Sequence, residues 1–393
     1  MSDEAHRQAA ALYNRACELQ QRQELQAALA AYDEALALDP NFASAYSNRG
    51  AALAALNRCD EALASLDRAI DLQPDYAEAH FCRAVTLLMQ GDLLSGWVEF
   101  EWRWKTAPGR AMRQAKNFLK PRWLGEDEVA GRTLLLYAER GLGDTLQFCR
   151  YAYMVSQRRA KVVLQVQAPL VDLLRRQSVD IQVVGEAEKL PDYDLHCSLL
   201  SLPLVFKTAL ASIPAPRRYL RADADEVARL RAGLASIGTP RVGLVWRGDA
   251  NNPDDFRRSI ALRDVLRNLP DELHYFSLQK DITPEEQPLI DAQANLSVVG
   301  AAINFELTAA LCECLDVVIA IDTSVAHLAA ALGVRTWILL PFNADCRWLL
   351  EREDTPWYPT ARLYRQETRG DWADVLLRVR ADLERLARGV ERL

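Results

Sequence analysis

The feature that most restricts the fold of this chain is a 34-residue period in its first third. Asp39-Pro40 is matched by Gln73-Pro74, so a proline recurs after 34 residues. Self-similarity at a fixed period of this length predicts stacked helical hairpins, with small residues where two helices cross. The same spacing relates the small residues Ala28, Ala62 and Gly96 and the large apolar residues Tyr32, Leu66 and Phe100.

This pattern of small residues, large residues and a proline after the second helix resembles the tetratricopeptide repeat. The resemblance implies helix pairs at about 6–38, 43–72 and 77–104, in a repeat region assigned to residues 1–110. In the third pair, tryptophan-rich sequence replaces the usual second helix, at Trp97 and in Glu101–Trp104. We expect these tryptophans to pack against the next domain, because the end of a repeat stack has to be covered.

Beyond Trp123 the pattern changes to short apolar strands that alternate with helices, which predicts parallel sheets of Rossmann type. A proline- and glycine-containing gap at 203–240 is interpreted as a hinge between two such domains, assigned to 111–222 and 223–393. The predicted fold class is therefore α/β with all-α N-terminal repeats. The predicted strands are 133–138, 161–166, 181–184, 241–246, 274–278, 296–299, 316–321 and 336–340.

The stretch Val317–Gly333 reads as a buried strand, a break at Asp322-Thr323-Ser324, and an alanine-rich helix. A cap by Thr323 or Ser324 would leave free N–H groups and the positive end of the helix dipole at the carboxyl end of a strand. That arrangement predicts a cradle for a phosphate-bearing ligand. The alternative is an ordinary strand-to-helix turn. His327, one helical turn after Thr323, belongs either to this site or to the core.

A second strand-to-helix loop carries Gly141-Leu142-Gly143-Asp144. Gly141 and Gly143 would let another molecule approach the backbone, but the third glycine of a nicotinamide-binding loop is missing. Asp144 is placed either to act as a general base or simply to cap the following helix.

Two further loops follow strands of the C-terminal half. Arg257-Arg258-Ser259 offers guanidinium groups that can grip phosphate through paired hydrogen bonds, or it forms a solvated loop. Gln279 and Lys280 bring an amide and an ammonium group to a strand end, where they contact a ligand or form only a polar terminus.

Together these four stretches resemble the heptosyltransferase-like glycosyltransferases of family 9, which have the two-domain GT-B fold, and most closely the subset fused to tetratricopeptide repeats. The resemblance implies that Asp144 is the base and that Asp322–Leu328 holds the diphosphate and sugar of the donor, with Asp322, Thr323, Ser324 and His327 in that motif. Either Arg257 or Arg258 would stand where classical members have a lysine. The repeat array is absent from those members.

The resemblance further implies transfer of a sugar from a nucleotide-diphosphate donor to a hydroxyl acceptor, independent of metal and with inversion. Gly141, Gly143, Ser259, Gln279 and Lys280 are then donor-binding residues, and the nucleotide sugar is a co-substrate rather than a cofactor. The final helix (372–388) would cross back to the N-terminal half, as in GT-B folds. Two alternatives remain open: a non-catalytic adaptor with a degenerate GT-B domain, and a nucleotide-sugar epimerase.

Composition limits the partners. The net charge of −7 and the lack of a basic block argue against nucleic acid. No apolar run has transmembrane length and the first 20 residues are too polar for a signal peptide, so we expect a cytoplasmic protein. The eight scattered cysteines are expected to be reduced thiols, with no metal site. The repeats would bind a protein or peptide acceptor or a second subunit of a homo-oligomer.

Overall fold

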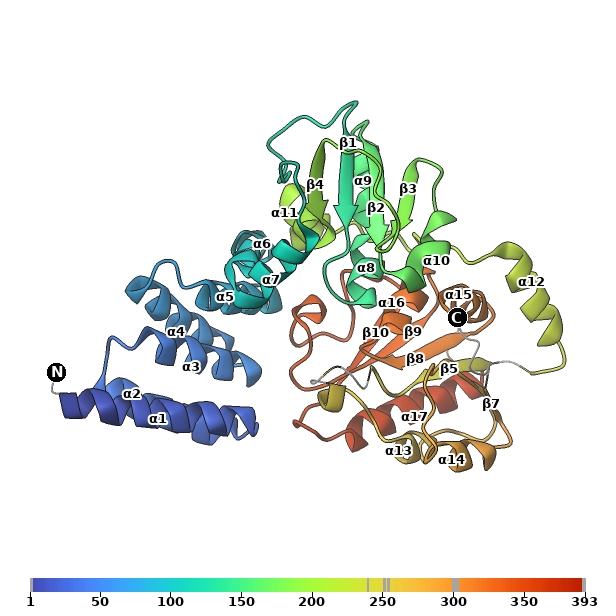
Figure 1. Ribbon diagram of the computed structural model, residues 1–393. Coiled ribbons are helices and arrows are strands. Elements are labelled where there is room, and N and C mark those ends of the chain that lie inside the picture. The colour runs from blue at the N-terminus through green and yellow to red at the C-terminus, as the bar shows by residue number, and fades with distance from the viewer. Residues whose placement is uncertain (1–2, 239, 250–251, 253–254, 299–303, 391–393) are drawn as a thin grey trace. The chain divides into compact units, whose positions relative to one another are not determined.

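The computed structural model describes residues 3–238, 240–249, 252, 255–298 and 304–390. They form two compact units (Figure 1). The first comprises the described part of Met1–Leu119 with Pro203–Ser212 and Asn343–Glu351. The second comprises Lys120–Leu202, Ile213–Phe342 and Arg352–Leu393, again in their described part.

The first unit is a stack of helix pairs, as the 34-residue period predicts. Small residues allow close crossings: a Cβ on Gly50 would lie 2.6 Å from Cγ of Leu66, and one on Gly96 would lie 2.6 Å from Cδ2 of Leu88. The pairs are α1 (Asp3–Gln21) with α2 (Leu25–Leu38), α3 (Ala43–Ala55) with α4 (Cys59–Leu72), and α5 (Ala77–Gln90) with α6 (Leu93–Phe100).

The end of the stack departs from the repeat, as its sequence does. Helix α6 is short and is followed by a 3₁₀ helix (Glu101–Lys105) and α7 (Ala107–Lys116). Trp97 and Trp104 are buried. Two segments that come from between later strands complete this unit: Leu210 lies against Gly91, and the Asn343 amide donates a hydrogen bond to the carbonyl of Ala54 (3.1 Å).

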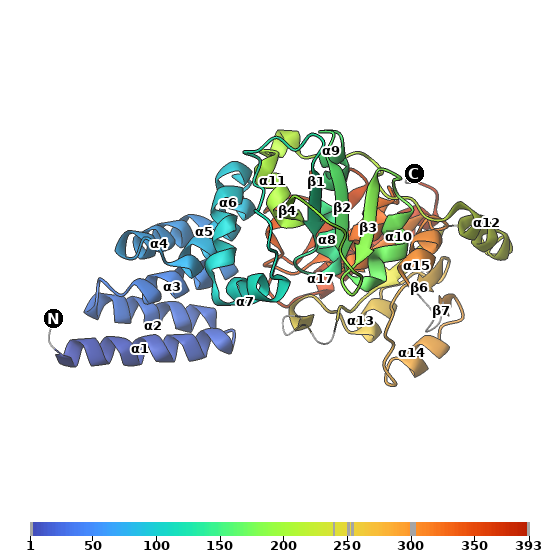
Figure 2. The same ribbon diagram turned by 45° about the horizontal axis from the view of Figure 1, so that its top comes forward.

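The second unit contains two wholly parallel sheets, so the fold class predicted from the sequence is confirmed (Figures 1 and 2). The smaller sheet has the order β3-β2-β1-β4, and Leu135 of β1 lies beside Val163 of β2. Its strands are β1 (Thr133–Tyr137), β2 (Lys161–Val166), β3 (Ile181–Gly185) and β4 (Leu195–Ser198), with helices α8 (Leu142–Phe148), α9 (Arg150–Ser156) and α10 (Val171–Arg175). Helix α11 (Leu202–Val205) follows β4 and lies, from Pro203 on, in the segment that belongs to the first unit.

The larger sheet has the order β10-β9-β8-β5-β6-β7. Val299, the last residue of the predicted strand 296–299, lies outside the described residues. The strands are β5 (Arg241–Val245), β6 (His274–Ser277), β7 (Leu296–Val298), β8 (Val317–Ile321), β9 (Thr336–Leu340) and β10 (Ala361–Arg365). The helices are α12 (Ala224–Gly233), α13 (Leu262–Leu266), α14 (Gln287–Asp291), α15 (Phe305–Cys312), α16 (Ser324–Ala331) and α17 (Ala373–Ala387).

The last helix corrects one prediction. Val375, Val379 and Leu383 of α17 recur at helical spacing and are buried in the core of the larger sheet. Asp382, the residue before Leu383, accepts a hydrogen bond from the hydroxyl of Tyr364 in β10 (2.8 Å). The prediction that this helix returns to the N-terminal half was therefore wrong, because its apolar face is used by its own sheet. The domain boundaries at 110/111 and 222/223 stay predictions.

Candidate functional site

The predicted site residues follow the carboxyl ends of parallel strands, where sheets of this kind bind ligands. Two of the loops come from different sheets, and the packing of α8 against α16 joins them (Figure 1). A Cβ on Gly143 would lie 2.7 Å from Cδ2 of His327. The close contact of Gly143 with the His327 ring therefore brings the loop after β1 to the loop after β8.

Asp144 is the third residue of α8, and its Oδ2 accepts a hydrogen bond from the N–H of Gly141 (3.0 Å). The capping interpretation is thus realised. A carboxylate has two oxygens and further lone pairs, so capping leaves capacity to accept a proton from a substrate. Asp144 is half-buried, which leaves a ligand access to it.

The two glycines beside Asp144 differ in what they make possible. Gly141 has ordinary backbone angles (φ −69°), and a Cβ there would meet nothing closer than Asp144 Oδ2 at 3.6 Å. Gly143 is required sterically by His327. The prediction that both glycines make room for a ligand stays a prediction, and for Gly143 the structure shows a partner within the chain.

The N-terminus of α16 lacks the predicted side-chain cap. Thr323 holds the N-cap position with extended backbone, but its hydroxyl makes no capping hydrogen bond. Its Oγ1 is buried and has no hydrogen-bond partner. The N–H groups of Ser324 and the next two residues in the first turn therefore donate no hydrogen bond to the Thr323 hydroxyl. A buried hydroxyl without a partner beside an uncapped helix end is what an oxyanion would satisfy.

His327 is a buried residue with partners on both ring nitrogens. Its Nδ1 lies 2.7 Å from the Tyr358 hydroxyl, and its Nε2 lies 3.6 Å from Oδ1 of Asp322. Only 2% of His327 is exposed, so it packs behind the loop rather than in it. These contacts hold the ring beside Asp322 and Tyr358, and the donor-binding role of His327 stays a prediction.

The arginine loop is braced against the same strand end. Arg258 donates from Nη1 to the carbonyl of Asp322 (2.7 Å) and from Nε to Oδ1 of Asp255 (2.9 Å). Ser259 donates to the other carboxylate oxygen of Asp255 and accepts a bond from the N–H of Gly248. A Cβ on Gly248 would lie 2.0 Å from Asp255 Oδ1, so only glycine fits there. Arg258 and Ser259 thus fix the loop.

Arg257, the other arginine of this loop, is partly buried. Its guanidinium lies over the exposed ring of Phe256, 5.7 Å from the centroid. Burial lowers the pKa of Arg369, and the positive charge of Arg257 lowers it further. The sequence left the choice between Arg257 and Arg258 open, and which of them contacts a ligand stays a prediction.

Gln279 and Lys280 are not brought to the α16 loop by any contact within the described residues. Gln279 is buried, and its Oε1 accepts a hydrogen bond from the N–H of Arg247 (3.1 Å). Arg247 in turn pairs with Glu286 (3.1 Å). Lys280 is exposed at the end of β6. The amide oxygen of Gln279 therefore braces the ends of β5 and β6, as a polar strand terminus would.

A buried arginine that the sequence reading missed connects the two sheets. Arg150 of α9 donates to the carbonyls of Trp357 (2.8 Å) and Pro214 (3.0 Å) and to the hydroxyl of Tyr219 (2.8 Å). Its guanidinium also lies 4.8 Å from the ring of Tyr358, the partner of His327. The backbone partners Pro214 and Trp357 follow Arg150 by 64 and 207 positions, so no local pattern marks them.

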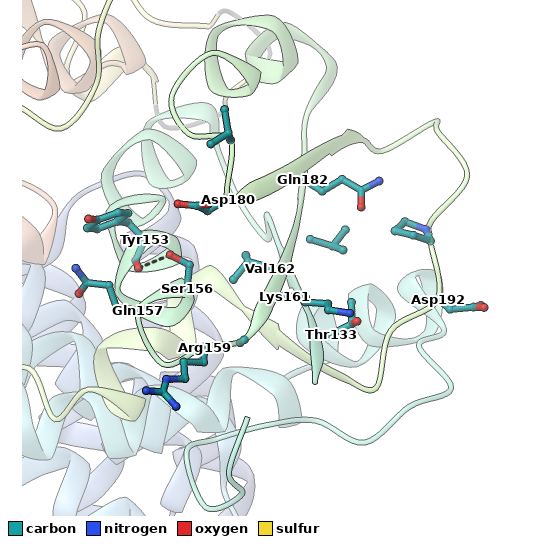
Figure 3. A pocket seen from close by; sticks show the side chains of 14 residues that line it. Thr133, Tyr153, Ser156, Gln157, Arg159, Lys161, Val162, Asp180, Gln182 and Asp192 are labelled. Carbon is teal, nitrogen blue, oxygen red and sulfur yellow. Dashed lines mark hydrogen bonds between the residues drawn. The ribbon is translucent and has the colours of Figure 1, made fainter. Parts of the chain in front are cut away.

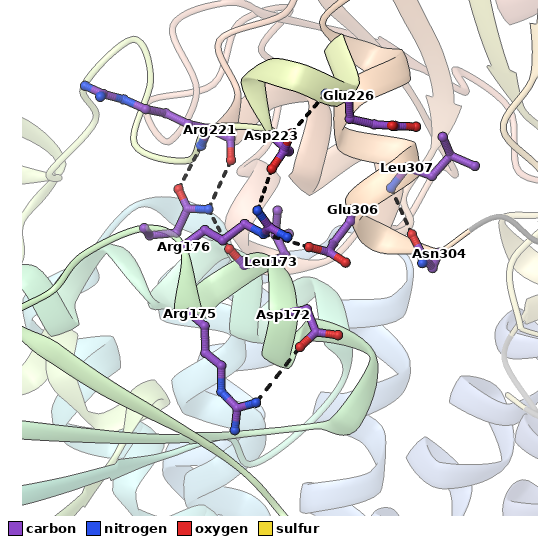
Figure 4. A network of polar contacts seen from close by, with 11 residues as sticks. Asp172, Leu173, Arg175, Arg176, Arg221, Asp223, Glu226, Asn304, Glu306 and Leu307 are labelled. Atoms are coloured by element: carbon purple, nitrogen blue, oxygen red, sulfur yellow. Dashed lines mark hydrogen bonds and ion pairs between the residues drawn. The ribbon is translucent and has the colours of Figure 1, made fainter. Parts of the chain in front are cut away.

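A second, exposed connection lies between α10 and the larger sheet's helices (Figure 4). Arg176 donates to Glu306 of α15 (2.9 Å) and pairs with Asp223 before α12. Gln177 exchanges two hydrogen bonds with the backbone of Arg221. The segment predicted as a hinge is thus tied to the end of α10 by polar contacts.

A hollow of about 770 Å³ lies elsewhere, at the amino ends of β1, β2 and β3 (Figure 3). Thr133, Lys161 and Gln182 line it, together with Tyr153 of α9. Ligands of parallel sheets bind at the opposite edge, where the loops described above lie. We therefore do not assign this hollow to the site.

The residues that the structure describes show neither a metal-binding cluster nor a membrane-spanning helix. Within them no group of three histidine, cysteine, aspartate or glutamate side chains is arranged to hold a metal ion. Cys312 and Cys314 are both buried thiols, and Cys314 packs beside Val227 of α12. In that part of the chain no helix combines the length and apolarity needed to cross a bilayer.

Known proteins resemble different parts of the chain. The family model of the TPR repeat matches residues 19–57 and 52–91, so the helix pairs are tetratricopeptide repeats. Protein FlbA of Caulobacter vibrioides is 27% identical over 344 residues, which cover 78% of this chain and 55% of FlbA. The chain thus spans about half the length of that curated relative.

Two solved glycosyltransferases resemble the second unit weakly. ADP-heptose lipopolysaccharide heptosyltransferase II of E. coli is 14% identical and has a TM-score of 0.45. The match covers 66% of this chain and 100% of the E. coli chain. The iron-containing dodecameric glycosyltransferase TibC of enterotoxigenic E. coli is 14% identical, covers 66% of this chain and 67% of its own, and has a TM-score of 0.43. Such low values carry no weight for function, which is inferred below from the site residues.

Proposed function

We propose that this protein is a glycosyltransferase that moves a sugar from a nucleotide-diphosphate donor to a hydroxyl acceptor. The observation that carries the proposal is the uncapped N-terminus of α16, with the buried, unpartnered hydroxyl of Thr323 beside it. A diphosphate supplies the oxygens that such a site lacks. The contact of Gly143 with His327 brings the carboxylate loop of the smaller sheet to this cradle.

The donor would lie over the carboxyl end of β8. Its diphosphate accepts hydrogen bonds from the first-turn N–H groups of α16 and from the Thr323 hydroxyl, and Arg257 contributes positive charge. Asp322, held by His327 and by the brace from Arg258, accepts hydrogen bonds from sugar hydroxyls. Ser324 opens the helix and offers a second hydroxyl. Lys280 would reach the nucleotide from the end of β6.

The proposed reaction is a single displacement at the anomeric carbon of the sugar. The acceptor hydroxyl gives its proton to the carboxylate of Asp144, and its oxygen forms a bond to the anomeric carbon of the sugar. The bond between that carbon and the diphosphate oxygen breaks, and the nucleoside diphosphate leaves with the electron pair. Because attack and departure occur on opposite faces, the configuration inverts.

Negative charge develops on the departing diphosphate. The helix end and Arg257 are fixed before the reaction, so they can stabilise that charge without reorganising. We propose that these groups take the part that a divalent cation plays in other transferases. The acceptor is proposed to be a protein or peptide held by the concave face of the repeats, in the cytoplasm.

The test separates the proposal from its two alternatives by acceptor dependence. The full chain is incubated with nucleotide sugars, with and without candidate acceptor proteins, and both products are measured. A transferase releases nucleoside diphosphate and glycosylates the acceptor. An epimerase converts the donor alone, and an adaptor does neither. Thermal-shift screening with nucleoside diphosphates selects the base first, since a ligand that binds the folded state raises its stability.

A further inference from the structure

Arg247, the second residue after β5, is not among the site residues predicted from the sequence, but it lies at the carboxyl end of the larger sheet. Val245, the last residue of β5, pairs with Ala320 of the neighbouring strand β8. Two residues further along the two strands stand Arg247 and Asp322. Because neighbouring strands lie about 4.8 Å apart, Arg247 leaves the sheet beside the α16 cradle.

The side chain of Arg247 is mostly buried and only partly satisfied. It is 19% exposed, and its Nη2 donates to Oε2 of Glu286 (3.1 Å) and to the carbonyl of Asp281. Its Nε is buried and has no hydrogen-bond partner in the described part of the chain. A buried donor of this kind is costly to the folded protein, and a ligand atom that accepts from it removes that cost.

Glu286 balances the charge of Arg247. Its Oε1 accepts from Nε1 of Trp246 (2.7 Å), and its Oε2 also accepts from the N–H of Thr283 (2.9 Å). Burial raises the pKa of the Glu286 carboxyl, but the hydrogen bonds from Thr283, Trp246 and Arg247 outweigh burial and leave the pKa below its usual value. The carboxylate is therefore ionised, the pair with Arg247 is neutral, and a neutral acceptor fits it better than an anion.

Gln279, after the next strand β6, adds a second donor. Its Oε1 accepts the N–H of Arg247 (3.1 Å), and the residue is 7% exposed. With the oxygen held by this bond, the side chain offers a ligand its NH₂ group. Arg247 and Gln279 thus both present donors at neighbouring strand ends, and the matching group on a ligand is a hydrogen-bond acceptor such as a carbonyl oxygen.

We propose that Arg247 and Gln279 select the nucleobase of the donor, and that they take a base bearing a carbonyl oxygen. This inference rests on the proposed function. With the diphosphate at the end of β8, the nucleoside would lie over the neighbouring ends of β5 and β6. Uracil, thymine, guanine and cytosine carry a carbonyl oxygen, whereas adenine has none and presents an amino group beside its ring acceptors.

The experiment uses the full chain and isothermal titration calorimetry with UDP, GDP, ADP, dTDP and CDP. All five share the diphosphate, so their relative affinities separate a contact with the base from a contact with phosphate. Wild-type protein is compared with Arg247→Lys, which keeps a positive charge for Glu286 but loses the Nε donor.

Arg241→Lys is the matched control. Arg241 is the first residue of the same strand, and its Nε is likewise buried without a hydrogen-bond partner among the described residues. It stands at the amino end of β5, however, opposite the edge where parallel sheets bind ligands. The control therefore shows what the loss of a buried guanidinium in this strand does by itself.

We expect wild-type protein to bind one of the four nucleotides with a base carbonyl more tightly than ADP. Arg247→Lys should bind that nucleotide about tenfold more weakly and the other nucleotides nearly as before, whereas Arg241→Lys should change neither. ADP as the tightest ligand, a uniform loss for all five nucleotides, an equal loss in Arg241→Lys, or unchanged affinities of Arg247→Lys would each overturn the inference and leave the proposed function standing.

Gln279→Glu provides a second, independent measurement. The carboxylate keeps an oxygen for the N–H of Arg247 but replaces the NH₂ donor with a second oxygen. We expect a thermal midpoint close to that of wild type and a loss of more than tenfold in affinity for the selected nucleotide, because the carboxylate repels the base carbonyl. Unchanged affinity in this folded variant would also overturn the inference. If wild-type protein binds none of the five nucleotides, the proposed function fails, and the inference fails with it.

Discussion

The two strand-to-helix loops of the second unit have the same plan and opposite outcomes. In the loop after β1, Asp144 closes the helix start by accepting the N–H of Gly141. In the loop after β8, Thr323 holds the N-cap position, which Gly141 holds in α8, and its hydroxyl is buried without a partner. A helix end that satisfies itself needs no ligand, whereas one left open is stabilised by binding an anion. The two loops therefore have different proposed roles. The first supplies the carboxylate of Asp144, and the second binds the negative charge of the diphosphate.

The largest expected effect is on turnover by Asp144→Asn. The amide cannot take the acceptor proton, so kcat should fall by about 10²- to 10⁴-fold. An amide oxygen can still accept the N–H of Gly141, so the helix start and the affinity for nucleoside diphosphate should persist. Steady-state kinetics and calorimetry on the same preparation check this. Turnover close to wild type would remove Asp144 from the mechanism.

Gly143→Ala tests the contact that joins the two loops. The new Cβ would lie 2.7 Å from the His327 ring, and the helix or the ring must move. We expect a loss of about 1–3 kcal/mol in the free energy of unfolding, measured by urea titration.

Gly141→Ala is the control for that substitution, because its nearest contact is 3.6 Å away. Combining Gly143→Ala with His327→Ala should recover part of the loss, since the second change empties the space. Strict additivity of the two changes would show that the two helices do not press on each other at this point.

Thr323→Val removes the unpartnered hydroxyl and keeps the side-chain shape. Because that hydroxyl is buried and unsatisfied, the thermal midpoint of the free protein should stay the same or rise. Affinity for nucleoside diphosphate should fall by about 1 kcal/mol, or roughly fivefold. A lower midpoint with unchanged affinity would mean that the hydroxyl serves the fold rather than a ligand.

The smallest expected effect concerns the exposed connection between the sheets. Arg176 is 54% exposed and pairs with Asp223 and Glu306, so Arg176→Gln should cost less than about 1 kcal/mol of stability. The difference from wild type should shrink further in high salt, because the pairs are screened. A larger loss of stability that persists in high salt would contradict this expectation. It would mean that the ion pairs of Arg176, rather than the contact of α8 with α16, hold the two sheets together.

Local patterns predicted the elements that repeat or alternate strongly. The helix pairs follow from the 34-residue period, and eight strands were predicted close to their observed bounds. Two strands were missed because their composition hides them. β4 is Leu-His-Cys-Ser, and β10 is Ala-Arg-Leu-Tyr-Arg, whose two arginines suit a strand at the edge of the sheet.

Long-range geometry accounts for the rest. The roles of Arg258 and Gln279 as braces depend on carbonyl and N–H groups of distant loops, which no spacing reveals. Arg150 has partners that follow it by 64 to 207 positions. The sequence did not reveal which sheet α17 packs on, because an apolar helix face of this kind can pack on either sheet. Only the tertiary structure shows that it packs on the larger sheet.

The sequence by itself determined the repeats, the alternation of strands and helices, and the two loops that end in Asp144 and in Asp322-Thr323-Ser324. These follow from local periodicity and from the preferences of glycine, proline and capping residues. Only the tertiary structure decided that one helix start is closed and the other open. That distinction depends on which hydrogen bonds the folded chain completes, and a hydroxyl's lack of a partner is a property of its three-dimensional surroundings.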